Sequence, residues 1–474
     1  MRRPTPLVTS LLALMLVTVA CRRERPEVPD VPAGPRWALR GDTAAFTTVG
    51  CAPRNDVVSY RFDWGDGDTS AWTDWYDGGQ RSKVLHIWGR DGLFEVRAQA
   101  RDRRDQCSDW SEPCTLAVVP MRPGTLKWTY ESWQRLWSMP AIGRDGALYF
   151  SEGTGITALD PDGSTRWNRD LDAQVLGPVA LAPDGAVCFF AEDGSLGMLE
   201  PDGALRWRVD VRGYESRASP AIQADGSVCI GTNDGNLQAF GPDARVKWSV
   251  VVAGDALASP SISQDRTIYF CTGSRDRAVY AVEPDGSVRW RFQADDGIRV
   301  APAVGADGRI YALDVWWRLY ALRSDGTPVW CTDLDPGVYC YYPSVVIGPG
   351  EVIYILTDYS LCAVRRNGRI LWEYETDDYT SGAPAVAADG SVCFTAGYPS
   401  VLHVVAPDGR LEWQYADIGW ISSSPTIGPD GTVYLVSNRG SDGALLAIQG
   451  TAPLADSPWP KHKRDIANTG RARP

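Results

Sequence analysis

From Trp128 onward, short apolar runs alternate with polar turns in a repeating order. Within residues 301–330, the apolar segment APAV leads through ADG into RIYAL, and LYALRSDG then leads into TPVW. Apolar runs of this length predict β-strands, and Asp-Gly supplies the positive φ angles that a two-residue hairpin turn needs. Each unit of about 40 residues therefore predicts four short antiparallel strands.

Two residue markers repeat with this unit, a tryptophan that closes it and a proline that opens it. The tryptophans are Trp128, Trp167, Trp207, Trp248, Trp290, Trp330, Trp372 and Trp413. The prolines are Pro140, Pro178, Pro220, Pro260, Pro302, Pro343, Pro384 and Pro425. Eight markers of each kind predict an all-β fold whose main part, residues 121–452, is an eight-bladed β-propeller of four-stranded blades.

The tryptophan follows a recurring Pro-Asp-Gly turn, as in EPDGSVRW at residues 283–290. We expect this turn to lead into the outermost strand of each blade, and the tryptophan to dock that blade onto its neighbour. The last unit ends before any such tryptophan, whereas the segment 125–130 comes before the first proline. We therefore expect 125–130 to complete the eighth blade, because pairing the two chain ends removes an exposed sheet edge.

The region before the propeller has a different organisation. Arg2 and Arg3 precede an apolar stretch, which indicates an export signal over residues 1–20. The Pro-rich segment 21–35 predicts an extended tether. Short alternating segments over 36–120 predict a small antiparallel β-sandwich, and residues 453–474 form a C-terminal tail with a Trp-Pro pair.

Charge and histidine content exclude several functions. The chain has 47 Lys and Arg against 59 Asp and Glu, a net charge of −12, so we expect no nucleic-acid partner. His86, His403 and His462 are the only histidines and lie in three different segments, which argues against a multi-histidine metal site or a Ser-His-Asp triad. No phosphate-binding Gly-Lys-Ser/Thr loop is present.

The end of the export signal, TVAC, resembles a bacterial lipoprotein signal. This resemblance implies that Cys21 is lipidated and anchors the protein in a membrane, facing the periplasm or the cell surface. A plain secretory signal with Cys21 left unmodified is the alternative.

The run YRFDWGDGDTSAW, followed by HIWGRDGLFEVRAQARD, resembles the PKD domain, an immunoglobulin-like sandwich of bacterial surface proteins. In the fold that this resemblance implies, the loops of Cys51 and Cys107 share one end, which favours a Cys51–Cys107 disulfide. Asp63, Asp66 and Asp68 fit either a calcium site or a tight turn, and the turn already explains them.

The blade sequences ITALDPDGSTRW and VYAVEPDGSVRW resemble the PQQ-like repeats of quinoprotein dehydrogenases and of many non-enzymatic relatives. A quinoprotein enzyme carries an adjacent-cysteine disulfide and long insertions between blades. This chain has no Cys-Cys dipeptide, and its tryptophan spacing varies only between 39 and 42 residues. We therefore expect no cofactor, no metal and no enzymatic activity; a quinone-dependent dehydrogenase is the alternative.

The remaining cysteines follow the repeat. Cys188, Cys229 and Cys393 occupy positions held by tyrosine in other blades, which favours buried space-filling over a role as nucleophiles. Cys331 and Cys340 bracket one loop and either bridge it or stay free.

A binding site, if present, is expected on the face formed by the loops that enter the inner strands and by the turns between the second and third strands. The candidate residues there are Trp133, Trp137, Tyr214, Arg217, Trp316, Trp317, Tyr341, Tyr379 and Trp420. Aromatic side chains with a few charges suit peptide segments or sugars; packing between blades is the alternative for half of them. The leading hypothesis is a monomeric, membrane-anchored scaffold that binds envelope proteins or glycans.

Overall fold

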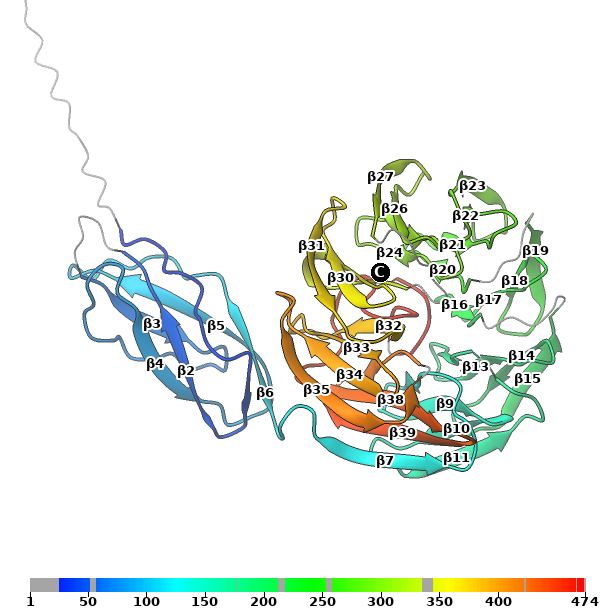
Figure 1. Ribbon diagram of the computed structural model, residues 1–474, viewed down its shortest axis with the longest axis horizontal. Helices are drawn as coiled ribbons and strands as arrows, with labels where there is room; N and C mark the ends of the chain where they lie inside the picture. The colour runs from blue at the N-terminus through cyan, green and yellow to red at the C-terminus, as the bar shows by residue number, and fades with distance from the viewer. Residues whose placement is uncertain are drawn as a thin grey trace, which may run out of the picture. The chain divides into compact units, whose positions relative to one another are not determined.

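The computed structural model describes residues 25–51, 57–175, 177–211, 218–252, 258–334, 344–421, 423–465 and 467–472. These residues form two units, a small β-sandwich and a ring of β-sheets. Figure 1 shows the ring with its sheets arranged around a central axis. Each unit is built from strands, and the only helical element among the described residues is a 3-10 turn at Pro349–Glu351.

The sandwich has one sheet in the order β1-β6-β5-β3 and a second sheet of β2 and β4. Its strands are β1 (Trp37–Leu39), β2 (Thr43–Thr48), β3 (Ser59–Asp63), β4 (Ser82–Ile87), β5 (Gly92–Arg101) and β6 (Cys114–Val119). Alternate residues of these strands face inward, and Phe46 of β2 and Phe62 of β3 are fully buried. Trp64 and Trp88, which directly follow β3 and β4, are almost fully buried as well.

The acidic run after β3 is a hydrogen-bonded turn. The carboxylates of Asp63 and Asp66 accept the backbone N–H groups of Gly65 and Asp68, both at 3.0 Å. Although burial opposes ionisation, hydrogen bonds from His86 and from the Asp68 backbone hold the pKa of Asp66 below its usual value. No group of three His, Cys, Asp or Glu side chains in the described part of the chain is placed to hold a metal ion.

The predicted Cys51–Cys107 disulfide is wrong, because both residues are free cysteines in the structure. Cys51 follows β2, and its carbonyl accepts the N–H of Glu27. Cys107 follows β5 in the other sheet, where it pairs with Arg101 at the end of a tight turn. The two loops are therefore held by separate hydrogen bonds on different sheets. Cys331 is likewise free and exposed, and Cys340 lies outside the described residues.

Four consecutive units form the first four blades of the ring, each a four-stranded antiparallel sheet in chain order. The first and second blades are β8 (Ala141–Ile142), β9 (Leu148–Glu152), β10 (Gly155–Leu159) and β11 (Thr165–Asp170), then β12 (Ala180–Leu181), β13 (Val187–Phe190), β14 (Ser195–Leu199) and β15 (Leu205–Asp210). The third and fourth are β16 (Ala221–Ile222), β17 (Val228–Gly231), β18 (Asn236–Phe240) and β19 (Val246–Val251), then β20 (Ser261–Ile262), β21 (Ile268–Cys271), β22 (Ala278–Val282) and β23 (Val288–Gln293).

The next three blades repeat this order. They are β24 (Ala303–Val304), β25 (Ile310–Leu313), β26 (Arg318–Leu322) and β27 (Pro328–Asp333); β28 (Val345–Ile347), β29 (Ile353–Leu356), β30 (Ser360–Val364) and β31 (Ile370–Glu375); and β32 (Thr380–Val386), β33 (Val392–Ala396), β34 (Ser400–Val405) and β35 (Leu411–Ile418). The middle strands of each blade are buried on both faces, whereas the outer strands alternate between half-buried and exposed residues.

The eighth blade joins the two ends of the propeller. It consists of β36 (Trp420–Ile421) and β37 (Thr426–Ile427), both paired with β38 (Thr432–Arg439), then β39 (Asp442–Gln449) and finally β7 (Leu126–Ser132). Figure 1 shows β7 running beside β39. The all-β, eight-bladed propeller fold predicted from the repeat is confirmed.

Seven of the eight repeat tryptophans contact the turn that leads into the outermost strand of the next blade along the chain. Six indole N–H groups donate to a backbone carbonyl of that turn at 2.8–3.2 Å: Trp128 to Pro161, Trp167 to Pro201, Trp248 to Pro284, Trp290 to Ser324, Trp330 to Arg366 and Trp372 to Pro407. Trp413 packs on the turn before β7, where its ring lies 3.2 Å from the position of a Cβ on Gly124. These contacts join neighbouring blades into a closed ring.

The turn glycine is required for two reasons, as Gly409 illustrates. Its φ is +87°, which side chains rarely adopt, and a Cβ there would lie 2.9 Å from the Trp372 ring. The third blade departs from this pattern, because Ala244 stands at the corresponding position with φ at +66°. Its tryptophan partner, Trp207, is one whose indole N–H has no hydrogen-bond acceptor among the described residues.

Three repeat cysteines lie in the core between blades. Cys188, Cys229 and Cys393 are 0–2% exposed and pair with an alanine of the inner strand, as Tyr149 does in the first blade. Burial raises the pKa of the Cys229 and Cys393 thiols to about 12. They therefore stay protonated near neutral pH and fill space as small apolar side chains.

Candidate functional site

One end of the ring carries the loops that vary most between blades. Because the strands of a blade alternate in direction, the loop entering each inner strand lies at the same end as the turn between the second and third strands. We call this end the loop face. The described aromatic candidates are found in or beside these segments: Trp133 and Trp137 before β8, Trp316 and Trp317 between β25 and β26, Tyr379 before β32, and Trp420 in β36.

Three exposed tyrosines form a patch on the sixth and seventh blades, which we call the tyrosine patch: Tyr359, Tyr379 and Tyr398. Their exposed fractions are 43%, 58% and 79%. The ring centroids of Tyr359 and Tyr379 lie 4.6 Å apart with an interplanar angle of 36°. The Tyr359 and Tyr379 rings therefore present a continuous aromatic surface to solvent, and Tyr398 adds a third exposed ring on the adjoining turn.

Backbone hydrogen bonds hold the three tyrosine loops together. The carbonyl of Tyr359 accepts the N–H of Thr376 at 2.7 Å, and the carbonyl of Tyr379 accepts the N–H of Gly397 at 2.9 Å. Asp378 adds side-chain contacts, since its carboxylate accepts the N–H groups of Tyr379 at 2.7 Å and Tyr398 at 3.3 Å. The patch is therefore organised in the unbound protein.

The tyrosine patch is accompanied by acidic side chains. Asp358 precedes Tyr359 in the chain, and Asp377 and Asp378 precede Tyr379. Segments 357–360, 375–381 and 396–400 contain no lysine or arginine. The hydrogen bond with Tyr379 raises the pKa of Tyr359 to about 12, so its hydroxyl stays neutral at pH 7. The sequence argument missed these carboxylates because it assigned aspartates to hairpin turns.

Trp420 extends the aromatic surface toward the eighth blade. It is 46% exposed and pairs with Asn438 of β38. The neighbouring Gly419 accepts the N–H of Ser400 at 3.1 Å, which links this loop to the turn that carries Tyr398. Four exposed rings thus come from four adjacent loops.

The two adjacent tryptophans of the fifth blade point in opposite directions, which corrects the prediction for one of them. Trp316 is 50% exposed, and its indole donates to Asp296 at 3.0 Å. Trp317 is only 2% exposed and packs in the core, so it is not a surface residue. The reason is the turn: Asp314 accepts the N–H groups of Trp316 and Arg318, and Trp317 takes a positive φ of 62° that turns its ring inward.

The first-blade candidates differ in exposure. Trp133 is 89% exposed, whereas Trp137 is half-buried beside Arg135, whose guanidinium lies 5.9 Å from its ring centroid. Tyr214, Arg217 and Tyr341 lie outside the described residues, as does Cys21.

The C-terminal tail lies in the middle of the ring (Figure 1). It pairs with the last residues of the inner strands, which places it at the end opposite the loop face. Five inner-strand N–H groups donate to tail carbonyls at 2.6–3.0 Å: Leu181 to Ala467, Ile222 to Thr469, Ile262 to Gly470, Ile347 to Trp459 and Val386 to Pro460. Ala388, in the turn after β32, donates to Pro453 at 2.7 Å. Trp459 is 1% exposed and belongs to the core of the fourth, fifth and sixth blades. The tail therefore ties together five inner strands.

Two tail lysines are fully buried. Lys461 donates to the Asn468 side chain at 2.6 Å, and Lys463 donates to the carbonyl of Ser219 at 2.9 Å. Burial lowers the pKa of Lys461 to about 7 and that of Lys463 well below its usual value. Both amines therefore resist protonation in the folded state.

This burial predicts a pH-dependent stability. Between pH 7 and pH 9 the unfolded chain keeps Lys461 protonated while the folded chain loses the proton, so the free energy of unfolding should rise with pH by about 2–3 kcal/mol from this residue. Below the folded pKa of about 7 the contribution levels off. Urea unfolding at pH 7 and pH 9 measures the rise, and Lys461→Met should remove part of it. If the free energy of unfolding rose equally between pH 7 and pH 9 in both proteins, Lys461 would not be the source of the pH dependence.

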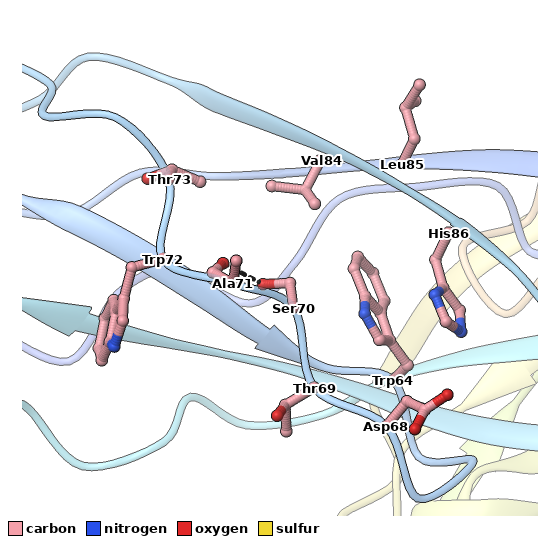
Figure 2. A pocket seen from close by; sticks show the side chains of 10 residues that line it. All are labelled: Trp64, Asp68, Thr69, Ser70, Ala71, Trp72, Thr73, Val84, Leu85 and His86. Carbon is pink, nitrogen blue, oxygen red and sulfur yellow. Dashed lines mark hydrogen bonds between the residues drawn. The ribbon is translucent and has the colours of Figure 1, made fainter.

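The sandwich has a surface groove of about 480 Å³ between the segment 68–73 and β4. Figure 2 shows Val84 pointing toward Ser70 and Ala71, while Leu85 points away from the groove. Trp72 at its border lies against Arg61 and Arg101, whose guanidinium carbons are 4.9 and 4.6 Å from its ring centroid. The groove offers few reactive groups, because the imidazole of its one histidine, His86, is already paired with the Asp66 carboxylate at 2.7 Å.

Among the residues that the structure describes, no helix is long and apolar enough to cross a membrane.

Comparison with known proteins identifies one matching protein family and several structures with a similar fold. The sequence of residues 192–277 and 268–451 matches the family described as outer membrane protein assembly factor BamB. The crystal structure of BamB from Moraxella catarrhalis is 18% identical, with a TM-score of 0.57 over 68% of this chain and 99% of that one. The C-terminal WD40 domain of Sif2 is 12% identical, with a TM-score of 0.57 over 69% and 100%. At these identities the two structures share the propeller fold.

A shorter match falls on a fifth of the chain. The PKD domain of an M14-like peptidase from Thermoplasmatales archaeon SCGC AB-540-F20 is 30% identical over 20% of this chain and 96% of that one, with a TM-score of 0.19. No curated protein matches the chain.

Proposed function

Since this chain belongs to the family described as outer membrane protein assembly factor BamB, we propose that it is a membrane-tethered envelope scaffold that holds a partner protein on its loop face. The propeller serves as a rigid platform, and the sandwich separates that platform from the tether. Catalysis is not part of this proposal, because the described site offers rings and carboxylates without a paired nucleophile and base.

The observation that carries the proposal is the tyrosine patch. Tyr359, Tyr379 and Tyr398 are exposed, and hydrogen bonds to Asp378 and between their loops fix them in place. Aromatic side chains dominate protein interfaces because they bury large area at little cost in conformational entropy. The opposite end of the ring interior is filled by the C-terminal tail, which favours the loop face as the docking side.

The tether is proposed from the lipoprotein-like sequence before Cys21 and from the outer-membrane role in the family description. Cells that make the protein should incorporate a radioactive fatty acid into it, and Cys21→Ala should abolish the label. A labelled Cys21→Ala protein would contradict the tether.

Quantitative co-purification from envelope extracts tests the scaffold role. The wild-type chain should retain a defined partner protein, and Tyr379→Ala combined with Tyr398→Ala should reduce that partner about tenfold or more, since truncating a central aromatic anchor costs about 2 kcal/mol or more. Arg365→Ala is the matched control, because Arg365 lies in the turn at the far end of β30 from Tyr359. Equal recovery with the patch variant, or recovery of a glycan alone, would contradict the proposal.

A further inference from the structure

We propose that the tyrosine patch and its three aspartates recognise a basic peptide segment of the partner, with arginine or lysine side chains over the tyrosine rings. This inference rests on the proposed docking role of the loop face and names the chemistry that the face selects.

The rings provide the first half of the argument. A cation within about 6 Å of an aromatic centroid is attracted by the ring face. Tyr359 and Tyr379 lie 4.6 Å apart and tilted by 36°, and Tyr398 is 79% exposed on the adjoining turn. A guanidinium can therefore contact one ring while its neighbour along the peptide reaches another.

The same stacking geometry already occurs within this protein. In the sandwich, the Arg61 guanidinium lies 4.9 Å from the Trp72 centroid and 5.2 Å from the Trp110 centroid. Arg101 lies 4.6 Å from Trp72 and 5.3 Å from Trp75. There each guanidinium contacts two indole rings. The tyrosine patch offers phenol rings, which attract cations in the same way, and its own loops contain no arginine or lysine.

The carboxylates provide the second half. Asp358 and Asp378 act electrostatically on Tyr359, and Asp377 adjoins Asp378 in the same loop. The three loop segments themselves contain no lysine or arginine. The whole chain also has a net charge of −12, which attracts basic partners over longer distances. Phosphate-bearing ligands would be repelled, so a basic polypeptide fits the site better than a nucleic acid or an acidic lipid head group.

The test uses the purified full-length chain and two labelled peptides of equal length, one of alternating arginine and serine and one of alternating glutamate and serine. Fluorescence anisotropy should show saturable binding of the arginine peptide, weakened by salt, and much weaker binding of the glutamate peptide. Asp358→Asn combined with Asp377→Asn should weaken the arginine peptide about tenfold, and Arg365→Ala should leave it unchanged.

Substitutions at Tyr398 separate ring attraction from simple apolar contact. Tyr398→Phe should keep the affinity within about twofold, whereas Tyr398→Leu should lower it about fivefold or more, because leucine has no π face. Equal affinities for the two peptides, or no effect of the aspartate and leucine variants, would overturn the basic-peptide assignment.

Failure of this inference can be distinguished from failure of the scaffold role. If the patch variants lose the partner in co-purification but the arginine peptide does not bind, the scaffold role stands and the partner chemistry proposed here is wrong. If the arginine peptide binds while co-purification is unchanged, the scaffold role fails and the site binds basic segments in another context.

Discussion

Trp372→Ala should lower the free energy of unfolding of the propeller by about 3 kcal/mol, the cost of truncating a large aromatic side chain at a packed contact. The indole of Trp372 donates to the carbonyl of Pro407 at 2.8 Å and covers the Gly409 turn of the next blade. Its ring also packs against Tyr354, with centroids 5.9 Å apart. Truncation therefore removes a hydrogen bond and a contact between blades together, as urea unfolding followed by tryptophan fluorescence can measure.

A matched pair of turn variants tests the same contact from the opposite side. Gly409→Ala should destabilise by about 1–3 kcal/mol, because it adds a Cβ 2.9 Å from the Trp372 ring at a φ of +87°. Ala244→Gly, at the corresponding turn of the third blade, should stabilise the protein by up to about 1 kcal/mol, because the Cβ of Ala244 strains the backbone at its φ of +66°. If both substitutions changed the free energy of unfolding in the same direction by similar amounts, the docking of each tryptophan on a turn glycine would be contradicted.

Removal of the C-terminal tail by a stop after Thr451 should have the largest effect, a loss of about 5 kcal/mol or more. The tail accepts five hydrogen bonds from inner strands and a sixth from the turn after β32, and Trp459 lies 1% exposed in the core. Because the stability of a whole domain is about 5–15 kcal/mol, the truncated propeller should lose its cooperative unfolding transition and become sensitive to protease.

Trp459→Ala provides the graded control for the deletion. It leaves the backbone hydrogen bonds in place and should cost about 3 kcal/mol, less than the full deletion. A truncated protein that unfolds at the same urea concentration as the full-length chain would show that the tail is dispensable for the ring.

The propeller could be predicted because its information is local and repeated. Each Asp-Gly turn fixes a hairpin, and eight equally spaced tryptophans and prolines determine the number of blades. The pairing of β7 with β39 follows from the same count, because one outer strand was missing at the end of the chain and one was present before the first proline.

The site was less predictable, because side-chain direction depends on long-range packing. Trp316 and Trp317 have the same sequence signal, yet only the turn geometry around Asp314 decides which ring enters the core. The course of the tail through the ring leaves no periodic pattern in the sequence. The Cys51–Cys107 prediction failed for a related reason: a shared end of a sandwich does not bring two loops within bonding distance.

The measurement that tests the account most directly is site-specific photo-cross-linking in the cells that make the protein. A photoreactive amino acid is placed at Tyr398 on the loop face and, in a second strain, at Arg365 at the other end of the neighbouring blade. We predict one protein adduct of defined mass from position 398 and none from position 365. An adduct from position 365 alone, or equal adducts from both positions, would contradict docking on the loop face.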